Sequence, residues 1–301
     1  MIRSALRRKI IAALAVVAGL ALWAPQALAQ DKCDLTMTTQ SQWVIRHDPF
    51  GDNQLSLPFE IQFSNAGRTP CVGRLEVTSI GNKRVLESRT SAQTVPFSLR
   101  DETNRNNLTP GSSENLVGRT TLVRAGSTAT GRITFAVTPP ADIAAGRYTQ
   151  TVTVQFRMPN GEIHAATDVT LVFEVTPSLM IGLAGEFTRV NGTPTLNLGD
   201  LTQNGVVPLN AKVYVRSSSG YQVTVTSENR GLLLHEQPGW AIPYGLRLGG
   251  TEINLGSPHI MTSREARARV DDYPLRIDVR DIGGKRAGRY RDILRFTVTA
   301  I

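Results

Sequence analysis

Apolar and polar residues alternate with a period of two along much of this chain, the pattern of strands that bury one face. Segments 55–63 and 131–137 alternate clearly, and runs rich in Val, Thr, Ile and Tyr lie between clusters of Gly, Asn, Pro and Ser. Asn-Gly pairs at 160–161, 191–192 and 204–205 are strong turn signals. Since no convincing amphipathic helix is found, the sequence predicts an all-β fold of two immunoglobulin-like β-sandwich domains.

The best domain boundary is the Thr-Pro-Ser stretch at 176–178. It follows an alternating strand that ends at Val175, and it precedes a new strand-like run from Leu179 to Leu183. We therefore expect an N-terminal domain over 30–176 and a C-terminal domain over 178–301.

The first 29 residues have the three parts of a secretory signal peptide. Four basic residues lie within 3–9, an apolar run covers 10–23, and Ala27-Leu28-Ala29 matches an A-x-A cleavage site. We expect 1–29 to be removed, which makes Gln30 the new N-terminus. No later run of about 18 apolar residues occurs, so no transmembrane segment is expected in the mature chain.

The net charge is modest once the signal peptide is removed. The full sequence has 33 basic and 25 acidic residues, a net charge of +8. Removing the four basic residues of 1–29 leaves 29 against 25, a net charge of +4. Without a clustered basic stripe, nucleic acid is not an expected partner.

The chain has two cysteines, Cys33 and Cys71, both in the predicted N-terminal domain. An even pair in a secreted domain predicts a disulfide, which closes a loop of about 40 residues and stabilises by roughly 3–4 kcal/mol. The alternative is a reactive or metal-binding thiol pair.

A short repeat exposes an asymmetry between the two domains. Residues 287–290, Ala-Gly-Arg-Tyr, repeat residues 145–148 and open a similar alternating strand. The earlier strand is followed by a turn at 159–161 and a second alternating strand that ends at Val175, whereas no such strand follows the later copy. We expect the C-terminal domain to lack its last strand.

A sandwich short of one strand exposes core side chains along a groove and leaves backbone N–H and C=O groups unpaired. An alternating strand from another polypeptide satisfies both deficits by strand addition. The predicted acceptor groove is lined by Leu179, Ile181, Leu294, Phe296 and Val298.

From about Leu196 the sequence resembles the spore coat protein U-like domain of subunits in archaic (Csu-type) chaperone–usher pili. The segments that carry the resemblance are 197–201, 213–217, 221–227, 242–248, 287–292 and 297–299. The resemblance implies an incomplete immunoglobulin-like pilin domain. A periplasmic chaperone holds such a domain first, and the N-terminal strand of a neighbouring subunit completes it later.

The resemblance also implies a place in the fibre. Between the expected cleavage site and Cys33 lie only three residues, too few for a donor strand. We therefore expect a subunit that accepts a strand and gives none, namely a two-domain tip adhesin that mediates cell attachment and biofilm formation. Its expected partners are the periplasmic chaperone, the usher and a neighbouring pilin subunit. It would pass through the periplasm to the fimbrium at the cell surface or be secreted.

The expected surface-binding domain has apolar groups beside turn signals. If they are exposed at loop tips, they contact a hydrophobic surface or receptor. The alternative is that Trp43 and Ile45 are strand core residues and that Phe50 covers a loop. The candidate binding residues are Trp43, Val44, Pro49, Phe50, Val95, Pro96 and Phe97.

Catalysis finds little support. The four histidines are widely scattered, and no metal-binding, nucleophile-elbow or phosphate-loop motif occurs. We expect no enzyme, no metal and no cofactor, although two carboxylates that meet in the fold would remain possible. Two other classes stay open: a periplasmic pilus-assembly chaperone, and a stand-alone secreted carbohydrate-binding β-sandwich.

Overall fold

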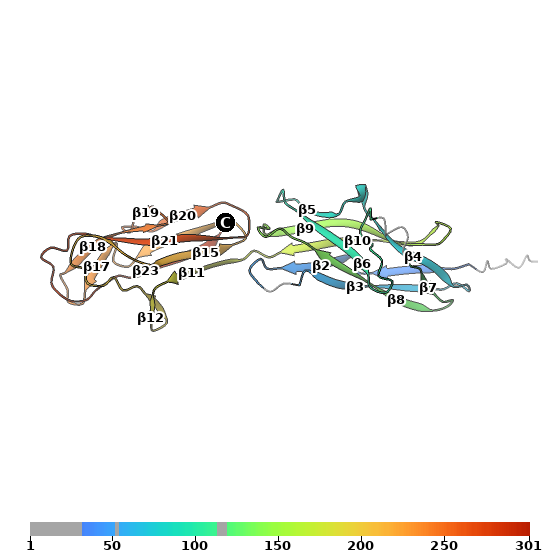
Figure 1. The fold of residues 1–301 in the computed structure, drawn as a ribbon, viewed down its shortest axis with the longest axis horizontal. Helices are drawn as coiled ribbons and strands as arrows, with labels where there is room; N and C mark the ends of the chain where they lie inside the picture. Colours follow the sequence, from blue (N-terminus) through green and yellow to red (C-terminus); the bar gives the residue numbers. More distant parts are fainter. Residues whose placement is uncertain (1–31, 52–53, 113–118) are drawn as a thin grey trace, which may run out of the picture.

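A computed structural model describes residues 32–51, 54–112 and 119–301 of the protein. The predicted signal peptide lies outside the described residues. Within them the all-β prediction is confirmed, because the regular structure consists of strands and one short 3-10 helix, Ile80–Asn82. No helix in this part of the chain is long and apolar enough to cross a bilayer. The strands form two groups, placed end to end in Figure 1, which we call the N-terminal half and the C-terminal half.

The N-terminal half folds as two layers of strands that are linked at one edge, and its described pairs are antiparallel except for the parallel pair β10–β2. One layer has the order β1-β3-β8-β6, and the other contains β5, β9, β10 and β2 with β4 and β7 beside them. The strand bounds are β1 Leu35–Thr39, β2 Gln42–His47, β3 Ser56–Asn65, β4 Cys71–Thr78, β5 Val85–Ser88, β6 Thr94–Asp101, β7 Thr121–Val123, β8 Thr128–Val137, β9 Gly146–Arg157 and β10 Ile163–Val175.

The core of the N-terminal half lies between these layers, because the alternating strands turn every second side chain inward. Aromatic rings from facing strands are in contact there. The ring centroids of Phe63 of β3 and Phe156 of β9 are 5.8 Å apart, and those of the stacked Trp43 of β2 and Phe59 of β3 are 5.1 Å apart. The order β1-β3-β8-β6 opposite β4-β9-β10 is that of an immunoglobulin-like sandwich.

The C-terminal half has the same two layers with fewer strands in the second. Its larger sheet has the order β11-β15-β21-β18-β17-β22, with β14 and β19 beside it, and its smaller sheet is β20-β16-β23. The β12–β13 hairpin protrudes from this half (Figure 1). The bounds are β11 Leu179–Gly185, β12 Thr188–Val190, β13 Thr193–Thr195, β14 Gly205–Val207, β15 Ala211–Ser217, β16 Tyr221–Ser227, β17 Leu232–His235, β18 Ala241–Leu248, β19 Thr251–Ile253, β20 His259–Ser263, β21 Arg269–Val279, β22 Tyr290–Arg291 and β23 Leu294–Ala300.

The Ala-Gly-Arg-Tyr repeat builds the same corner in both halves. Gly146 and Gly288 have φ values of 146° and 148°, a region that glycine adopts far more readily than other residues. Two residues later, the Tyr148 hydroxyl donates to the Ala144 carbonyl at 3.0 Å, and the Tyr290 hydroxyl donates to the Arg286 carbonyl at 2.7 Å. Each is a tyrosine corner. Tyr148 lies in β9, whereas Tyr290 lies in the short strand β22, which Asp292 and Ile293 separate from β23. β23, with β22 before it, is therefore the counterpart of β9.

The two halves meet at residues 176–178. β10 ends at Val175 and β11 begins at Leu179, and the described strand pairs stay within one half or the other. Backbone bonds join the halves from two loops: Ala145 N–H donates to Ser218 O at 3.1 Å, and Ala268 N–H donates to Ile143 O at 3.2 Å. The boundary itself stays a prediction.

Candidate strand-acceptor site

β9 of the N-terminal half is paired along both edges. β4 and β5 pair with one edge, and β10 pairs antiparallel with the other, with Val152 opposite Val169. β10 in turn pairs in parallel with β2. The strand that follows β9 thus lies between β9 and β2 and closes this layer.

β23, its equivalent in the C-terminal half, is paired along one edge. β16 pairs antiparallel with it, with Val225 opposite Phe296 and Val223 opposite Val298. No described strand pairs with the other edge of β23, where the counterpart of β10 would lie. That edge presents backbone N–H and C=O groups available to another strand.

The open edge leaves the inward side chains of β23 less covered than those of β9. Tyr148, Val152, Val154 and Phe156 of β9 are at most 1% exposed. The equivalent residues of the C-terminal half pack against its core but are only half-buried: Tyr290 of β22, and Leu294, Phe296 and Val298 of β23. Equivalent side chains are therefore buried in the N-terminal half, where β10 lies beside β9, and half-buried in the C-terminal half, where no described strand takes that place.

β11 borders the other side of this gap. It pairs with β15, and Cα atoms of β11 and β23 come within 8 Å of each other without strand pairing. Its inward residues Leu179, Ile181 and Leu183 are half-buried against the same core. The five predicted groove residues thus lie on the two strands that flank the gap. Leu183 was missed, although it continues the alternation of Leu179 and Ile181.

Asp292 fixes the beginning of β23. Its carboxylate accepts hydrogen bonds from the hydroxyls of Ser227 at 2.5 Å and Tyr244 at 2.6 Å, and from the backbone N–H of Asn229 at 3.0 Å. Burial, together with this carboxylate, raises the pKa of Tyr244. The strand is therefore held in place at one end while its long edge stays open.

The predicted surface-binding residues of the N-terminal half fall in two groups. Trp43 and Val95 are fully buried and Phe97 is 5% exposed, and all three lie in strands, so the prediction that they are loop tips is wrong. The inward phase of β2 and β6 places them in the core, as the alternative for Trp43 and Ile45 predicts. Four residues retain some exposure: Val44 in β2, Pro49 and Phe50 in the turn after it, and Pro96 in β6.

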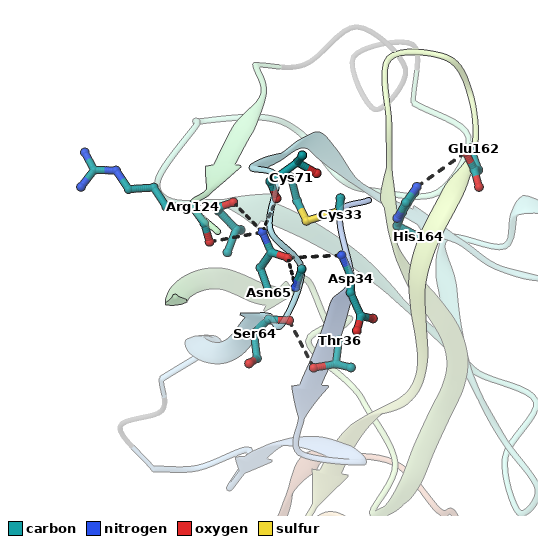
Figure 2. The surroundings of a disulfide bond; sticks show 12 residues. Cys33, Asp34, Thr36, Ser64, Asn65, Cys71, Arg124, Glu162 and His164 are labelled. Atoms are coloured by element: carbon teal, nitrogen blue, oxygen red, sulfur yellow. Dashed lines mark hydrogen bonds and ion pairs between the residues drawn. A yellow bond between two sulfur atoms is a disulfide. The ribbon is translucent and has the colours of Figure 1, made fainter. Parts of the chain in front are cut away.

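The disulfide prediction is confirmed. Cys33 and Cys71 are bonded, with Cα atoms 5.2 Å apart, and the bond ties the segment before β1 to the start of β4 (Figure 2). Beside it, the buried Asn65 side chain joins three segments of the chain by hydrogen bonds. This end of the N-terminal half is therefore rigidly built.

No cluster of three or more metal-ligating side chains occurs among the described residues. A depression of about 420 Å³ beside β18 and β19 is lined by Tyr244, Glu252, His259 and Arg280 among others. Arg280 is paired there with Asp278 at 3.1 Å. Its lining offers no nucleophile–base arrangement of the kind that catalysis needs.

No family model and no curated protein matches this sequence. Among solved structures, it is similar to a chain of the chaperone–tip adhesion subunit pre-assembly complex CsuC–CsuE of Acinetobacter baumannii Csu pili, with 12% identity, 87% of this chain and 99% of that chain covered, and a TM-score of 0.43. The CupB6 tip adhesin of Pseudomonas aeruginosa gives 10% identity, coverages of 88% and 94%, and a TM-score of 0.47. A mutant of the CFA/I enterotoxigenic E. coli adhesin CfaE gives 10% identity, with 88% of this chain and 93% of that chain covered, and a TM-score of 0.32. These similarities are too distant to carry a function to this chain.

Proposed function

We propose that this protein is a two-domain tip adhesin of a chaperone–usher pilus of the spore coat protein U-like type, and that its C-terminal half accepts a β-strand from another polypeptide. The incoming strand pairs with the open edge of β23, on the side that faces β11, and comes first from a periplasmic chaperone and then from a neighbouring pilin subunit. The usher assembles the fibre at the cell surface, where the N-terminal half makes the attachment that supports biofilm formation.

The open edge of β23 is the observation that carries this proposal. Among the described strands, β9 has a partner on both edges and buries its inward residues, whereas β23 has one partner and half-buries them. An incoming strand gains main-chain hydrogen bonds along β23 and covers apolar side chains, at about 25 cal/mol per Å² of apolar surface removed from water.

The state of β10 favours an acceptor over an assembly chaperone. A chaperone of this class donates a strand from its first domain, so that strand needs a free edge. β10 is bonded to β9 on one side and to β2 on the other. The N-terminal half is therefore complete and free to act as a binding unit.

Binding of a strand peptide to the full mature chain tests the proposal. The peptide is the N-terminal segment of a neighbouring pilin, identified from the gene cluster, and titration calorimetry measures its affinity. We expect binding that raises the melting temperature of the C-terminal half and newly protects amides of β23 from hydrogen exchange. Absence of binding, or full protection of β23 before the peptide is added, would rule out the acceptor role.

Two variants of neighbouring residues supply the matched comparison. Phe296→Asp puts a charge on the inward face of β23, and Thr297→Asp puts the same charge on its exposed face. We expect Phe296→Asp to abolish peptide binding and Thr297→Asp to change it less than about three-fold, because only the first buries an unpaired charge. Equal effects of the two variants would contradict a groove on the inward face.

A further inference from the structure

Asn65 organises the end of the N-terminal half that carries the disulfide. Its side-chain amide donates to the carbonyls of Thr69 at 2.9 Å and Arg124 at 3.2 Å, and its carbonyl accepts from the backbone N–H of Asp34 at 3.2 Å and Gly67 at 3.0 Å. The residue is 1% exposed. Segments 32–34, 65–71 and 119–128 are therefore held together as one surface, which we call the Asn65 end (Figure 2).

Basic side chains from all three segments emerge at the Asn65 end. Lys32, Arg68, Arg119 and Arg124 are exposed, and the only carboxylate on the three segments is Asp34. Four cations against one anion give a local charge of +3. No carboxylate among the described residues forms an ion pair with these four side chains. Figure 2 shows the Arg124 side chain directed away from the protein.

An aliphatic pair lies beside these cations. Val72 of β4 is opposite Leu122 of β7, one register step from Cys71 and Val123, and the two are 37% and 56% exposed. This neighbouring pair offers apolar contact of the kind made by the C–H faces of sugar rings. Aromatic platforms typical of neutral-sugar binding are absent from the three segments.

We infer that the Asn65 end is a binding surface for anionic polysaccharide, whose sulfate or carboxylate groups pair with Lys32, Arg68 and Arg124. Arginine suits this chemistry because its planar guanidinium binds carboxylate and sulfate oxygens with two hydrogen bonds. Cations held on rigid segments lose less conformational entropy on binding than cations on a flexible tail. The inference rests on the proposed role of the N-terminal half as the binding part, and it names the ligand class for that part.

Binding of the full mature chain to immobilised heparin tests the inference, with neutral dextran as the blank. We expect heparin binding that weakens steeply with salt, because the polyanion releases counterions on binding. The triple variant Lys32→Gln/Arg68→Gln/Arg124→Gln is expected to bind about ten-fold more weakly, since it removes three of the four cations of this surface.

A charge-matched variant separates a defined surface from diffuse attraction. Arg89→Gln/Arg247→Gln/Arg276→Gln removes three exposed cations that lie outside the Asn65 end. We expect it to retain heparin binding within about three-fold. Equal losses in both triple variants would overturn the inference, as would stronger binding to phosphatidylglycerol vesicles than to heparin.

The two proposals fail separately. The strand-peptide assay on the triple variant reports on the C-terminal half, which lies outside the substituted surface. Retained peptide binding with no heparin binding in the unsubstituted chain would refute the polysaccharide surface and leave the acceptor role standing. If the unsubstituted chain binds heparin but not the strand peptide, the acceptor role is refuted and the polysaccharide surface stands.

Discussion

Asn65 shows how much one buried polar side chain can contribute when its hydrogen-bonding capacity is used. Its amide nitrogen donates to the carbonyls of Thr69, Val123 and Arg124, and its oxygen accepts from the N–H groups of Asp34 and Gly67. Each of these backbone groups would otherwise require water at a surface where loops are packed together.

Asn65→Ala is expected to destabilise the protein by about 2–4 kcal/mol, because it leaves several backbone groups without partners at a buried site. Urea unfolding measured by tryptophan fluorescence of the N-terminal half gives the value. Thr36→Val is the control, since the Thr36 hydroxyl makes one exposed hydrogen bond to Ser64 O at 3.3 Å. We expect it to cost less than about 1 kcal/mol, and a similar cost for the two variants would contradict the role given to Asn65.

Buried tyrosines link stability to alkaline pH. Burial raises the pKa of Tyr221, Tyr244 and Tyr148, and the carboxylates of Asp271 and Asp292 reinforce this for the first two. Tyr221 donates to Asp271 at 2.5 Å, and Tyr244 donates to Asp292 at 2.6 Å. The folded protein therefore keeps these protons at a pH where the unfolded chain releases them.

The sign follows from proton counting. Above the unfolded tyrosine pKa of about 10, the unfolded chain binds fewer protons than the folded one, so the free energy of unfolding falls. We expect a loss of up to about 1.4 kcal/mol per pH unit for each such tyrosine, and none from this source below about pH 9. Urea unfolding between pH 8 and 11 measures the slope. Tyr244→Phe should make it shallower, and an unchanged slope would contradict the assignment.

At the scale of single elements, the two tyrosine corners differ in burial although they share geometry. Tyr148 is fully buried beside a strand that is paired on both edges, whereas Tyr290 is half-buried near the open edge of β23. The neighbouring strand therefore changes the environment of an otherwise repeated motif.

Removing each hydroxyl tests this difference. Tyr148→Phe is expected to cost about 1–2 kcal/mol, because it leaves the Ala144 carbonyl without its partner in a buried site. Tyr290→Phe is expected to cost less than about 1 kcal/mol in the free protein, because water reaches the Arg286 carbonyl. Differential scanning calorimetry of both variants measures the costs. A larger loss in Tyr290→Phe than in Tyr148→Phe would contradict the difference in burial.

The sequence predicts those elements that a local pattern of residues determines. Alternation identified the strands, and the repeat at 145–148 and 287–290 identified β9 and β23 as equivalent, because the same corner requires the same glycine and tyrosine. A short apolar segment does not reveal which of its side chains face the core. Trp43, Val95 and Phe97 were therefore assigned to exposed loops, although they lie in β2 and β6 and face inward. The convergence at Asn65 joins segments up to 59 residues from it, which no local pattern reveals.

At the scale of the whole molecule, Ser218 of the C-terminal half forms hydrogen bonds with the linking residues 176–178 and with the N-terminal half. Its hydroxyl accepts from Ser178 N–H at 2.9 Å and donates to Thr176 O at 3.4 Å. Its carbonyl accepts from Ala145 N–H, next to the corner of the N-terminal half. Ser218 is fully buried, so these bonds form where water does not compete.

These bonds predict that the two halves keep a fixed relative orientation in solution. Inserting Gly-Gly after Pro177 lengthens the link and separates Ser178 from Thr176, so the bonds of Ser218 cannot all form. We expect the halves to tumble independently, seen as separate rotational correlation times in NMR relaxation and as a broader distance distribution in small-angle X-ray scattering. The same insertion between Asn191 and Gly192, in the turn of the protruding hairpin, should leave both measurements unchanged. If the unaltered chain already shows two correlation times, the bonds of Ser218 do not hold the halves together in solution, and the prediction of a fixed orientation is wrong.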